Sequence, residues 1–254
     1  MVEIKGGSRA TERPRKLFTQ VFGIQGSGKT SLALSGPSPL FVANLDRNMD
    51  DLLEKLPPHY DIHYEEVQYD VDMNRGVAAN VMMKIQALFE KAMKMGLTGT
   101  FIVDGADLYW EYVKMAKLPD DADVPNQWGP ANSAMSSFFR RCESAPFQVF
   151  VTSIASKVWE GMKKETDRMQ ADGFKHAGRF INTSVYMFTP EDHSTPTIRP
   201  FERAGQTHSS YISLSKLNEK IVGSVIPNLS YKMLFRSVFG VLPPDHEKLW
   251  VPGS

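Results

Sequence analysis

Short apolar runs, each ending in polar residues, recur along the chain as far as Ala155. They occupy residues 17–22, 39–46, 99–107 and 147–153. Continuous runs of this kind are typical of strands buried on both faces of a parallel sheet. Residues 62–69 instead alternate between apolar and polar positions, which indicates a weaker strand.

Two longer stretches repeat apolar residues every three or four positions, which is the spacing of one face of an α-helix. In residues 77–95 these positions are Val81, Ile85, Leu88 and Ala92, and in residues 131–144 they are Ala131, Met135, Phe138 and Cys142. A shorter helix is expected to begin at Thr30 and to stop at Gly36 and Pro37. Because strands alternate with helices, the pattern predicts an α/β fold, with a mostly parallel sheet and helices on both faces.

The pattern changes after Ala155. Residues 157–179 are charged and weakly patterned, and we expect a loop there. Candidate strands follow at 181–188, 195–201 and 209–215, so the fold is expected to have extra C-terminal strands. Residues 1–15, rich in Gly, Arg and Pro, are predicted to form a flexible arm. Residues 16–254 are predicted to form a single domain, with the tail from about residue 217 as an interface element.

The amino-acid composition excludes few classes of function. The chain has 254 residues and balances 29 Lys and Arg against 29 Asp and Glu, so any surface for a polyanion must be local. Cys142 is the only cysteine, which excludes an internal disulfide. No stretch approaches the ~20 consecutive apolar residues that cross a bilayer, and we expect a soluble, cytoplasmic protein without a membrane partner.

The stretch GIQGSGKT, residues 23–30, fits the pattern G-x-x-x-x-G-K-[ST] between a predicted strand and a predicted helix. A loop in this position directs backbone N–H groups and the positive end of a helix at phosphate oxygens. We therefore predict that it binds ATP, with Lys29 neutralising the β and γ oxygens and the Thr30 hydroxyl on Mg²⁺. The expected nucleotide contacts are Gly23, Gln25, Gly26, Ser27, Gly28, Lys29, Thr30 and Ser31.

A Mg²⁺ site of this kind needs an acidic partner at the same edge of the sheet. The stretch FIVD ends an apolar strand at Asp104, which makes Asp104 the predicted second metal ligand. Asp107 is either a further polar contact or the N-cap of a following helix.

ATP hydrolysis also needs a group that orients the attacking water. Asp46 is the best candidate, because it ends a strand whose carboxyl edge faces the same crevice, and Glu65 and Glu66 are alternates. Thr152 and Ser153 end the next predicted strand, where they would sense the γ-phosphate or make ordinary strand-terminal hydrogen bonds.

The order of these parts resembles the RecA-like P-loop core. More narrowly, five stretches look like the small RecA-like ATPases of bacteriophages that are associated with single-strand annealing and recombination. These stretches are GIQGSGKT, FIVDGAD, WGPAN, FVTSIASKVWEG and ADGFKHAGRFINTSVYM. The resemblance covers roughly residues 16–216 and implies a location in the host cytoplasm if the chain is phage-encoded.

The resemblance implies that residues 155–179 contact single-stranded DNA and respond to ATP. The stretch interleaves basic and stacking groups, which suits exposed bases, although it also holds acidic residues and a plain solvated loop stays open. The candidate DNA contacts are Lys157, Trp159, Lys163, Lys164, Arg168 and Lys175.

The resemblance also implies a homo-oligomer, either a filament or a ring, in which a basic residue reaches the neighbouring subunit's nucleotide. Lys216 is the candidate for that trans-acting role. The chain departs from RecA in having Asp46 where RecA has Glu, and in lacking an Arg that accompanies the trans-acting Lys.

Four functions follow from these features. The first is a DNA-binding, DNA-stimulated ATPase in recombination or annealing. The others are a ring-forming DNA motor or helicase-loading ATPase, a small-molecule phosphotransferase, and a nucleotide-binding scaffold without turnover. A phosphotransferase usually has an Arg-rich lid, whereas residues 156–179 contain two arginines.

Overall fold

The computed structural model describes residues 15–46, 49–56, 58, 60–67, 74–94, 99–118, 127–160, 163–189 and 209–240. Most of the predicted arm, residues 1–14, and the candidate strand at 195–201 lie outside these residues. Within the described residues, none of the helices combines the length and the hydrophobicity that a bilayer crossing needs.

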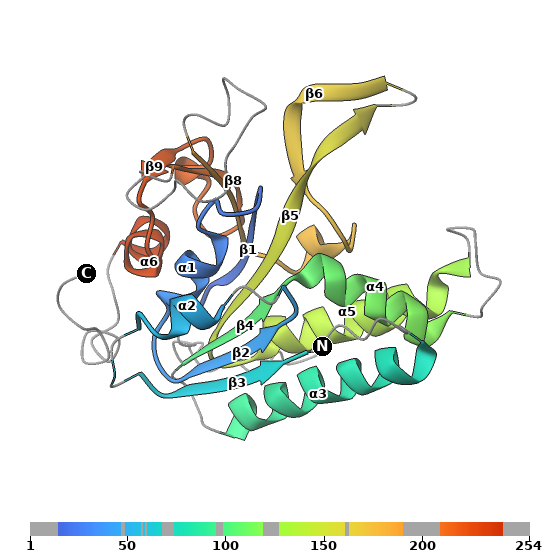
Figure 1. Cartoon of the computed structure of the whole chain (residues 1–254). Coiled ribbons are helices and arrows are strands. Elements are labelled where there is room, and N and C mark those ends of the chain that lie inside the picture. The colour runs from blue at the N-terminus through green and yellow to red at the C-terminus, as the bar shows by residue number, and fades with distance from the viewer. Residues whose placement is uncertain are drawn as a thin grey trace, which may run out of the picture.

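Strands and helices alternate through the first two thirds of the chain (Figure 1). The strands are β1 (Phe18–Gly23), β2 (Leu40–Asn44), β3 (Ile62–Glu66), β4 (Thr100–Asp104), β5 (Gln148–Glu160), β6 (Lys163–Ala171), β7 (Thr183–Phe188), β8 (Ser209–Ser215) and β9 (Val225–Pro227). The helices are α1 (Lys29–Leu34), α2 (Asp50–Leu53), α3 (Arg75–Lys94), α4 (Ala106–Lys117), α5 (Gly129–Ser144) and α6 (Tyr231–Phe239), with 3₁₀ turns η2 (Ala177–Arg179) and η4 (Glu219–Ile221).

The described strands form one sheet in the order β3-β2-β4-β5-β1-β7-β8-β9, with β6 paired to β5 outside this path. All pairs from β3 to β7 are parallel, whereas β8, β9 and β6 join antiparallel. Strand β5 therefore lies between β1 and β4, and the carboxyl ends of β1 and β4 lie at one edge, on either side of the middle of β5. The loop after β1 and Asp104, the last residue of β4, lie at that edge.

Two apolar cores cover the two faces of the sheet. Helices α3, α4 and α5 pack on one face over Phe101 and Val103, whereas α1 and α6 pack on the other over Ile102. Successive residues of β4 thus point into different cores, which explains why its sequence reads as a continuous apolar run. The α/β class predicted from the sequence is confirmed: the sheet is mostly parallel, has helices on both faces and carries extra C-terminal strands. That this core is RecA-like stays a prediction.

The structure corrects the prediction for residues 157–179. Strand β5 does not end at Ser153 but continues to Glu160, and β6 returns antiparallel to it. The hairpin of β5 and β6 projects beyond the helical layers (Figure 1). Among the described residues of this stretch, only 172–179 form a loop, which contains a 3₁₀ turn.

Three of the described helices were not predicted: the short α2, α4 and α6. Helix α4 begins at Ala106, directly after β4, and buries Tyr109, Trp110 and Tyr112. Helix α6 begins after Ser230, whose side chain accepts a hydrogen bond from the backbone N–H of Met233. It packs into the core beside α1, so the described fold extends to residue 240. An interface role for the tail from about residue 217 stays a prediction.

Candidate nucleotide-binding site

The glycine-rich loop joins the end of β1 to the start of α1 through a turn that glycine alone fits. A Cβ added to Gly23 would lie 2.3 Å from the carbonyl oxygen of Met187 on β7 and 2.5 Å from Ser27 Oγ. Gly28, at the N-cap of α1, has a φ of 90°, in the left-handed region that other residues rarely adopt. The first turn of α1 then presents its N–H groups to the loop.

Lys29 lies inside this loop, with 8% of its surface exposed. Its Nζ donates to the carbonyl oxygens of Gly23 at 3.1 Å and Ile24 at 2.9 Å. Ser27 is fully buried, and its hydroxyl has no hydrogen-bond partner within the described chain. A buried polar atom without a partner normally costs stability, so its presence next to Gly23 suits a bound phosphate oxygen.

Asp104 is the centre of the polar contacts at the sheet edge. It is 2% exposed, and the Thr30 hydroxyl donates to its two carboxylate oxygens at 3.0 and 3.1 Å. From β5, Thr152 Oγ1 donates to Asp104 Oδ1 at 2.6 Å and accepts from the backbone N–H of Gly105 at 3.0 Å. The fold thus brings together three predicted site residues, Thr30, Asp104 and Thr152.

The carboxyl groups of Asp46, Asp104 and Asp107 interact electrostatically at this edge with one another and with the ammonium group of Lys29. Burial raises the pKa of Asp104, the hydrogen bonds from Thr152 and Thr30 lower it, and Asp46 raises it further. Burial also raises the pKa of Asp46, which Lys29 opposes. The pKa of Asp107 rises to about 6, mainly through burial, with Asp46 and Asp172 adding to the shift. A cation near these groups would favour their ionised forms.

The donor set fits Mg²⁺ bound together with phosphates. No cluster of three or more His, Cys, Asp or Glu side chains suited to a metal occurs in the described part of the chain. Mg²⁺ commonly uses only one or two protein ligands and completes its shell with water and substrate phosphate. Thr30 and Asp104 provide such a pair beside the glycine-rich loop.

Asp46 lies next to this edge, just after β2. A Cβ added to Gly105 would be 3.6 Å from the Asp46 backbone nitrogen, and the pKa of Asp46 is sensitive to Lys29. The alternates, Glu65 and Glu66, lie farther from the loop. They end the edge strand β3, and three strands lie between β3 and β1. Glu65 also forms a 3.0 Å ion pair with Lys84 on α3.

The other residues predicted to contact the nucleotide, Gln25, Gly26 and Ser31, are exposed around the loop.

Lys216 follows β8 at the edge where the parallel strands begin, opposite the loop. Its Nζ donates to the Arg179 carbonyl oxygen at 2.8 Å. Within its own chain, Lys216 is therefore remote from the loop. Its trans-acting role stays a prediction.

The candidate DNA contacts are spread along the β5–β6 hairpin and the segment after it. Lys157 is half-buried on β5, and Lys175 is exposed in the loop after β6. The backbone register pairs Trp159 with Lys164. The side chains of Trp159, Lys163, Lys164 and Arg168 lie outside the described residues.

Two features of the site were not predicted. Asn44 ends β2 directly beside Asp104, is 1% exposed and donates to Tyr64 Oη at 2.7 Å. Its place at the end of an apolar run was the available sequence signal. A Cβ added to Gly173 would lie 2.9 Å from Asp107 Cα, so the segment after β6 packs directly on α4. No local pattern indicates such a long-range contact.

The structure corrects one alternative for Asp107: the N-cap of α4 is Gly105, not Asp107.

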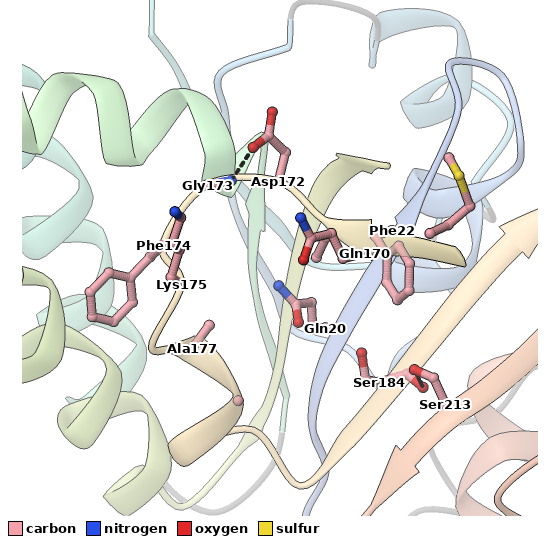
Figure 2. Close-up of a pocket in the computed structure, with 13 residues that line it drawn as sticks. Gln20, Phe22, Gln170, Asp172, Gly173, Phe174, Lys175, Ala177, Ser184 and Ser213 are labelled. Carbon is pink, nitrogen blue, oxygen red and sulfur yellow. Dashed lines mark hydrogen bonds between the residues drawn. The ribbon is translucent and has the colours of Figure 1, made fainter. Parts of the chain in front are cut away.

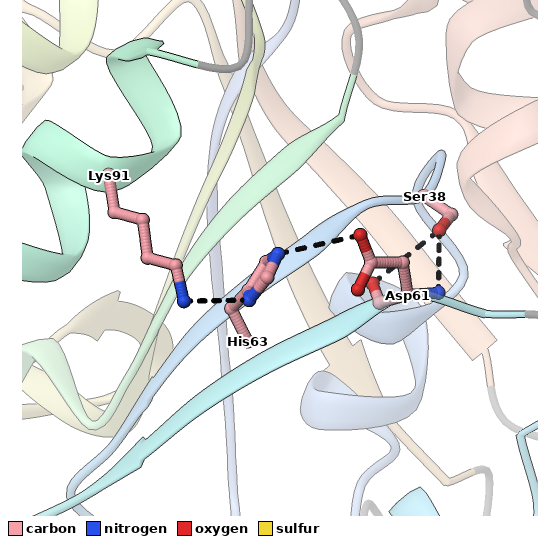
Figure 3. Close-up of polar contacts among 4 residues, drawn as sticks. All are labelled: Ser38, Asp61, His63 and Lys91. Carbon is pink, nitrogen blue, oxygen red and sulfur yellow. Dashed lines mark hydrogen bonds and ion pairs between the residues drawn. The ribbon is translucent and has the colours of Figure 1, made fainter.

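A second polar cluster lies at β3, the strand at one side of the sheet (Figure 3). Lys91 Nζ is 2.9 Å from His63 Nδ1, and His63 Nε2 is 3.4 Å from Asp61 Oδ2. The nearby Ser38 hydroxyl accepts from the Asp61 backbone N–H at 3.0 Å. Because this hydroxyl bonds to backbone and not to the imidazole, the cluster lacks the nucleophile and base contact of a hydrolytic triad. Its contacts join the starts of β2 and β3.

No protein-family model matches the sequence, and no curated protein is significantly similar to it. One of the solved structures that resemble the chain is described as a prototypical ATPase from the type III secretion system of pathogenic bacteria. The two share 16% sequence identity at a TM-score of 0.47, over 72% of this chain and 54% of that one. The chain thus matches about half the length of that protein. Nothing about activity or partners follows from a similarity this distant.

Proposed function

We propose that this protein binds and hydrolyses ATP with Mg²⁺ and that its nucleotide state controls its grip on single-stranded DNA in phage-type recombination or annealing. One observation carries the ATPase part: the Thr30 hydroxyl, next to the loop lysine, lies 3.0 Å from the carboxylate of Asp104. These two groups come from elements 74 residues apart, and their meeting beside a phosphate-binding loop supports a Mg²⁺-nucleotide site.

Each residue of the site has a defined task in this proposal. Mg²⁺ would supply positive charge at the phosphate oxygens, and Thr30 and Asp104 would hold it. The loop N–H groups and Lys29 bind the phosphates and offset the charge that develops in the transition state. Asp46, at the end of β2, orients the attacking water and accepts its proton.

The DNA part of the proposal is supported by the path of β5. Thr152, which donates to Asp104, lies on the strand that continues into the projecting hairpin. Basic residues and Trp159 occur along this hairpin, a combination that suits the backbone and the bases of a single strand. A change in the contacts of Asp104 would therefore act directly on the strand that carries these residues.

We further propose a homo-oligomer in which Lys216 contacts the nucleotide of a neighbouring copy. This is supported by the position of Lys216, which lies at the sheet edge opposite its own loop.

The test is ATP turnover with and without single-stranded DNA, measured together with DNA affinity. We expect Lys29→Ala to lose at least about a hundredfold in kcat, because transition-state charge is left uncompensated. Wild-type turnover in a folded Lys29→Ala protein contradicts the site assignment. Single-stranded DNA is expected to increase the ATP turnover of the wild-type protein but not that of Lys29→Ala.

The same measurement separates the DNA part from the ATPase part. Replacing Lys163, Lys164 and Arg168 by Ala should reduce the slope of log affinity against log salt by roughly two units, at about 0.7 per lost phosphate contact. Basal turnover should persist. A matched control replaces two exposed Lys and one exposed Arg elsewhere, Lys55, Lys94 and Arg140. An equal salt slope in both triple variants removes the hairpin from the DNA site.

A further inference from the structure

A cavity of about 530 Å³ lies beside the base of the hairpin, and none of the residues 23–30 of the glycine-rich loop lines it. Its floor is the sheet, with Gln20 and Phe22 on β1, Ser184 on β7 and Ser213 on β8 (Figure 2). The end of β6 and the segment after it form its wall, from Met169 to Gly178.

The cavity exists because the helices leave this part of the sheet face uncovered. Phe18, at the start of β1, packs into the core formed with α3, α4 and α5. Gln20 and Phe22 follow on the same face, since strand residues two apart point the same way. They face the cavity. The segment after β6 reaches across and packs Phe174 against Trp110 at 5.4 Å between ring centroids, which fixes the wall.

The lining combines amides and hydroxyls with two aromatic residues, Phe22 and Phe174. The described residues offer no hydrogen-bond partner to the side-chain amide of Gln20 or Gln170, and the Ser213 hydroxyl donates to the Ser184 carbonyl oxygen at 3.2 Å. Each amide can give two hydrogen bonds and accept two. Asp172 and Lys175, one acid and one base, are the charged residues of the lining, so the cavity does not select an anion.

Aromatic rings continue from the cavity along the sheet. The Phe22 ring stacks on Tyr186 at 5.3 Å, and Tyr186 stacks on Phe188 at 5.5 Å. Tyr186 and Phe188 are only half-buried. A partly exposed row of rings beside amide groups offers both stacking surfaces and edge hydrogen bonds.

We propose that this cavity binds a nucleobase of a single-stranded polynucleotide, with Gln20 and Gln170 hydrogen-bonding the base edge and the row of Phe22, Tyr186 and Phe188 stacking with its neighbours. The inference rests on the proposed function and adds a base-binding site to it. A volume of about 530 Å³ falls in the range of pockets for small organic groups. A neutral planar base with donors and acceptors on its edge matches amides and hydroxyls better than a phosphate does.

The position of the cavity also favours a strand that reaches the hairpin. Gln170 is on β6, the same strand as Lys163 and Lys164. A single strand whose phosphates follow the hairpin would pass the cavity at the hairpin's base. The phosphate contacts would then set the salt dependence, and the cavity would distinguish bases from an abasic backbone.

The experiment compares binding of a fluorescein-labelled mixed-sequence oligonucleotide and an abasic oligonucleotide of equal length to the full chain. The test variant is the double substitution Gln20→Leu and Gln170→Leu, which keeps side-chain size but removes the amides. Gln86→Leu, at an exposed glutamine on α3, is the matched control. We expect the double variant to bind the base-containing strand about tenfold more weakly, the loss of one good amide-to-base contact. Its affinity for the abasic strand, its salt slope and its basal ATP turnover should match the wild type.

Equal affinity of the double variant and the wild type for the base-containing strand overturns the proposal, as does a wild type that binds both strands equally. A double variant that alters sedimentation of the protein but not DNA binding shows that the cavity receives a second copy of the chain, which also overturns it. Failure of the wild type to bind any single strand removes the proposed DNA function and this site together. If only the phosphate contacts of the hairpin prove to be absent, the double variant should still bind the base-containing strand about tenfold more weakly than the wild type.

Discussion

Thr152→Val tests whether the contacts of Asp104 are as important as the geometry indicates. The hydroxyl of Thr152 makes two buried hydrogen bonds, donating to Asp104 Oδ1 at 2.6 Å and accepting from the Gly105 N–H at 3.0 Å. Valine keeps the shape of the side chain and removes both bonds. A buried N–H without a partner costs about 1–3 kcal/mol, and a hydrogen bond to a charged group contributes about 1.5–3 kcal/mol. Because Asp104 can become protonated in response, we expect a net loss of about 2–4 kcal/mol in unfolding free energy.

The same substitution at Thr19 is the control. Thr19 lies on the neighbouring strand β1, is fully buried, and has a hydroxyl without a hydrogen-bond partner in the described structure. Exchanging that hydroxyl for a methyl group should leave stability unchanged or raise it by about 1 kcal/mol. Urea unfolding of both variants at neutral pH measures the difference. Equal stabilities of Thr152→Val and Thr19→Val would refute the reasoning.

The remaining predictions concern the two carboxylates beside Asp104. Asp46→Asn should lower kcat by at least about a hundredfold while nucleotide affinity changes little, since a general base acts in the transition state; steady-state kinetics with equilibrium nucleotide binding measure both, and an unchanged kcat assigns the water to another group. Burial raises the pKa of Asp107 from 3.8 to about 6, so the folded protein binds more protons than the unfolded chain between these values and loses stability as pH rises through them. Asp107→Asn should therefore raise unfolding free energy at neutral pH by about 1–2 kcal/mol, after allowance for its partial exposure, and leave it unchanged below pH ~4. A variant that follows the wild-type pH profile of stability contradicts this.

Much of the core was predictable because its signals are local. The runs that became β1, β2 and β4 are buried on both faces, and burial on both faces is what a continuous apolar run predicts. The turn between β1 and α1 was predictable because its sequence pattern places glycine where the backbone leaves no room for a side chain, as at position 23. That this turn binds phosphate stays a prediction. Asp104 could be predicted as a polar end to a buried strand.

The hairpin and helix α4 had no comparable local signal, whereas α6 had one that was missed: a Ser230 N-cap followed by buried residues at helical spacing. The sequence of β6, KKETDRMQA, has almost no apolar residues, and alternation identifies a strand only when one of its faces is buried. Helix α4 starts one residue after β4 and opens with aromatic residues that also suit strands, so no polar stretch separates the two elements. The packing of Gly173 on Asp107 joins segments 66 residues apart, which no local pattern records.

Both ends of the hairpin are attached close to Asp104. On one side, Thr152 of β5 donates to the Asp104 carboxylate. On the other, Gly173 packs on Asp107 in the first turn of α4, and Phe174 next to it packs on the α4 residue Trp110. A nucleotide alters DNA affinity only to the extent that it binds the two states of the hairpin differently. In the proposed function, that difference would arise at Asp104, which would hold the metal of a bound nucleotide through the carboxylate that Thr30 and Thr152 now contact. A shift there would act on both ends of the hairpin at once and would therefore move it as a unit, together with the wall of the base-binding cavity.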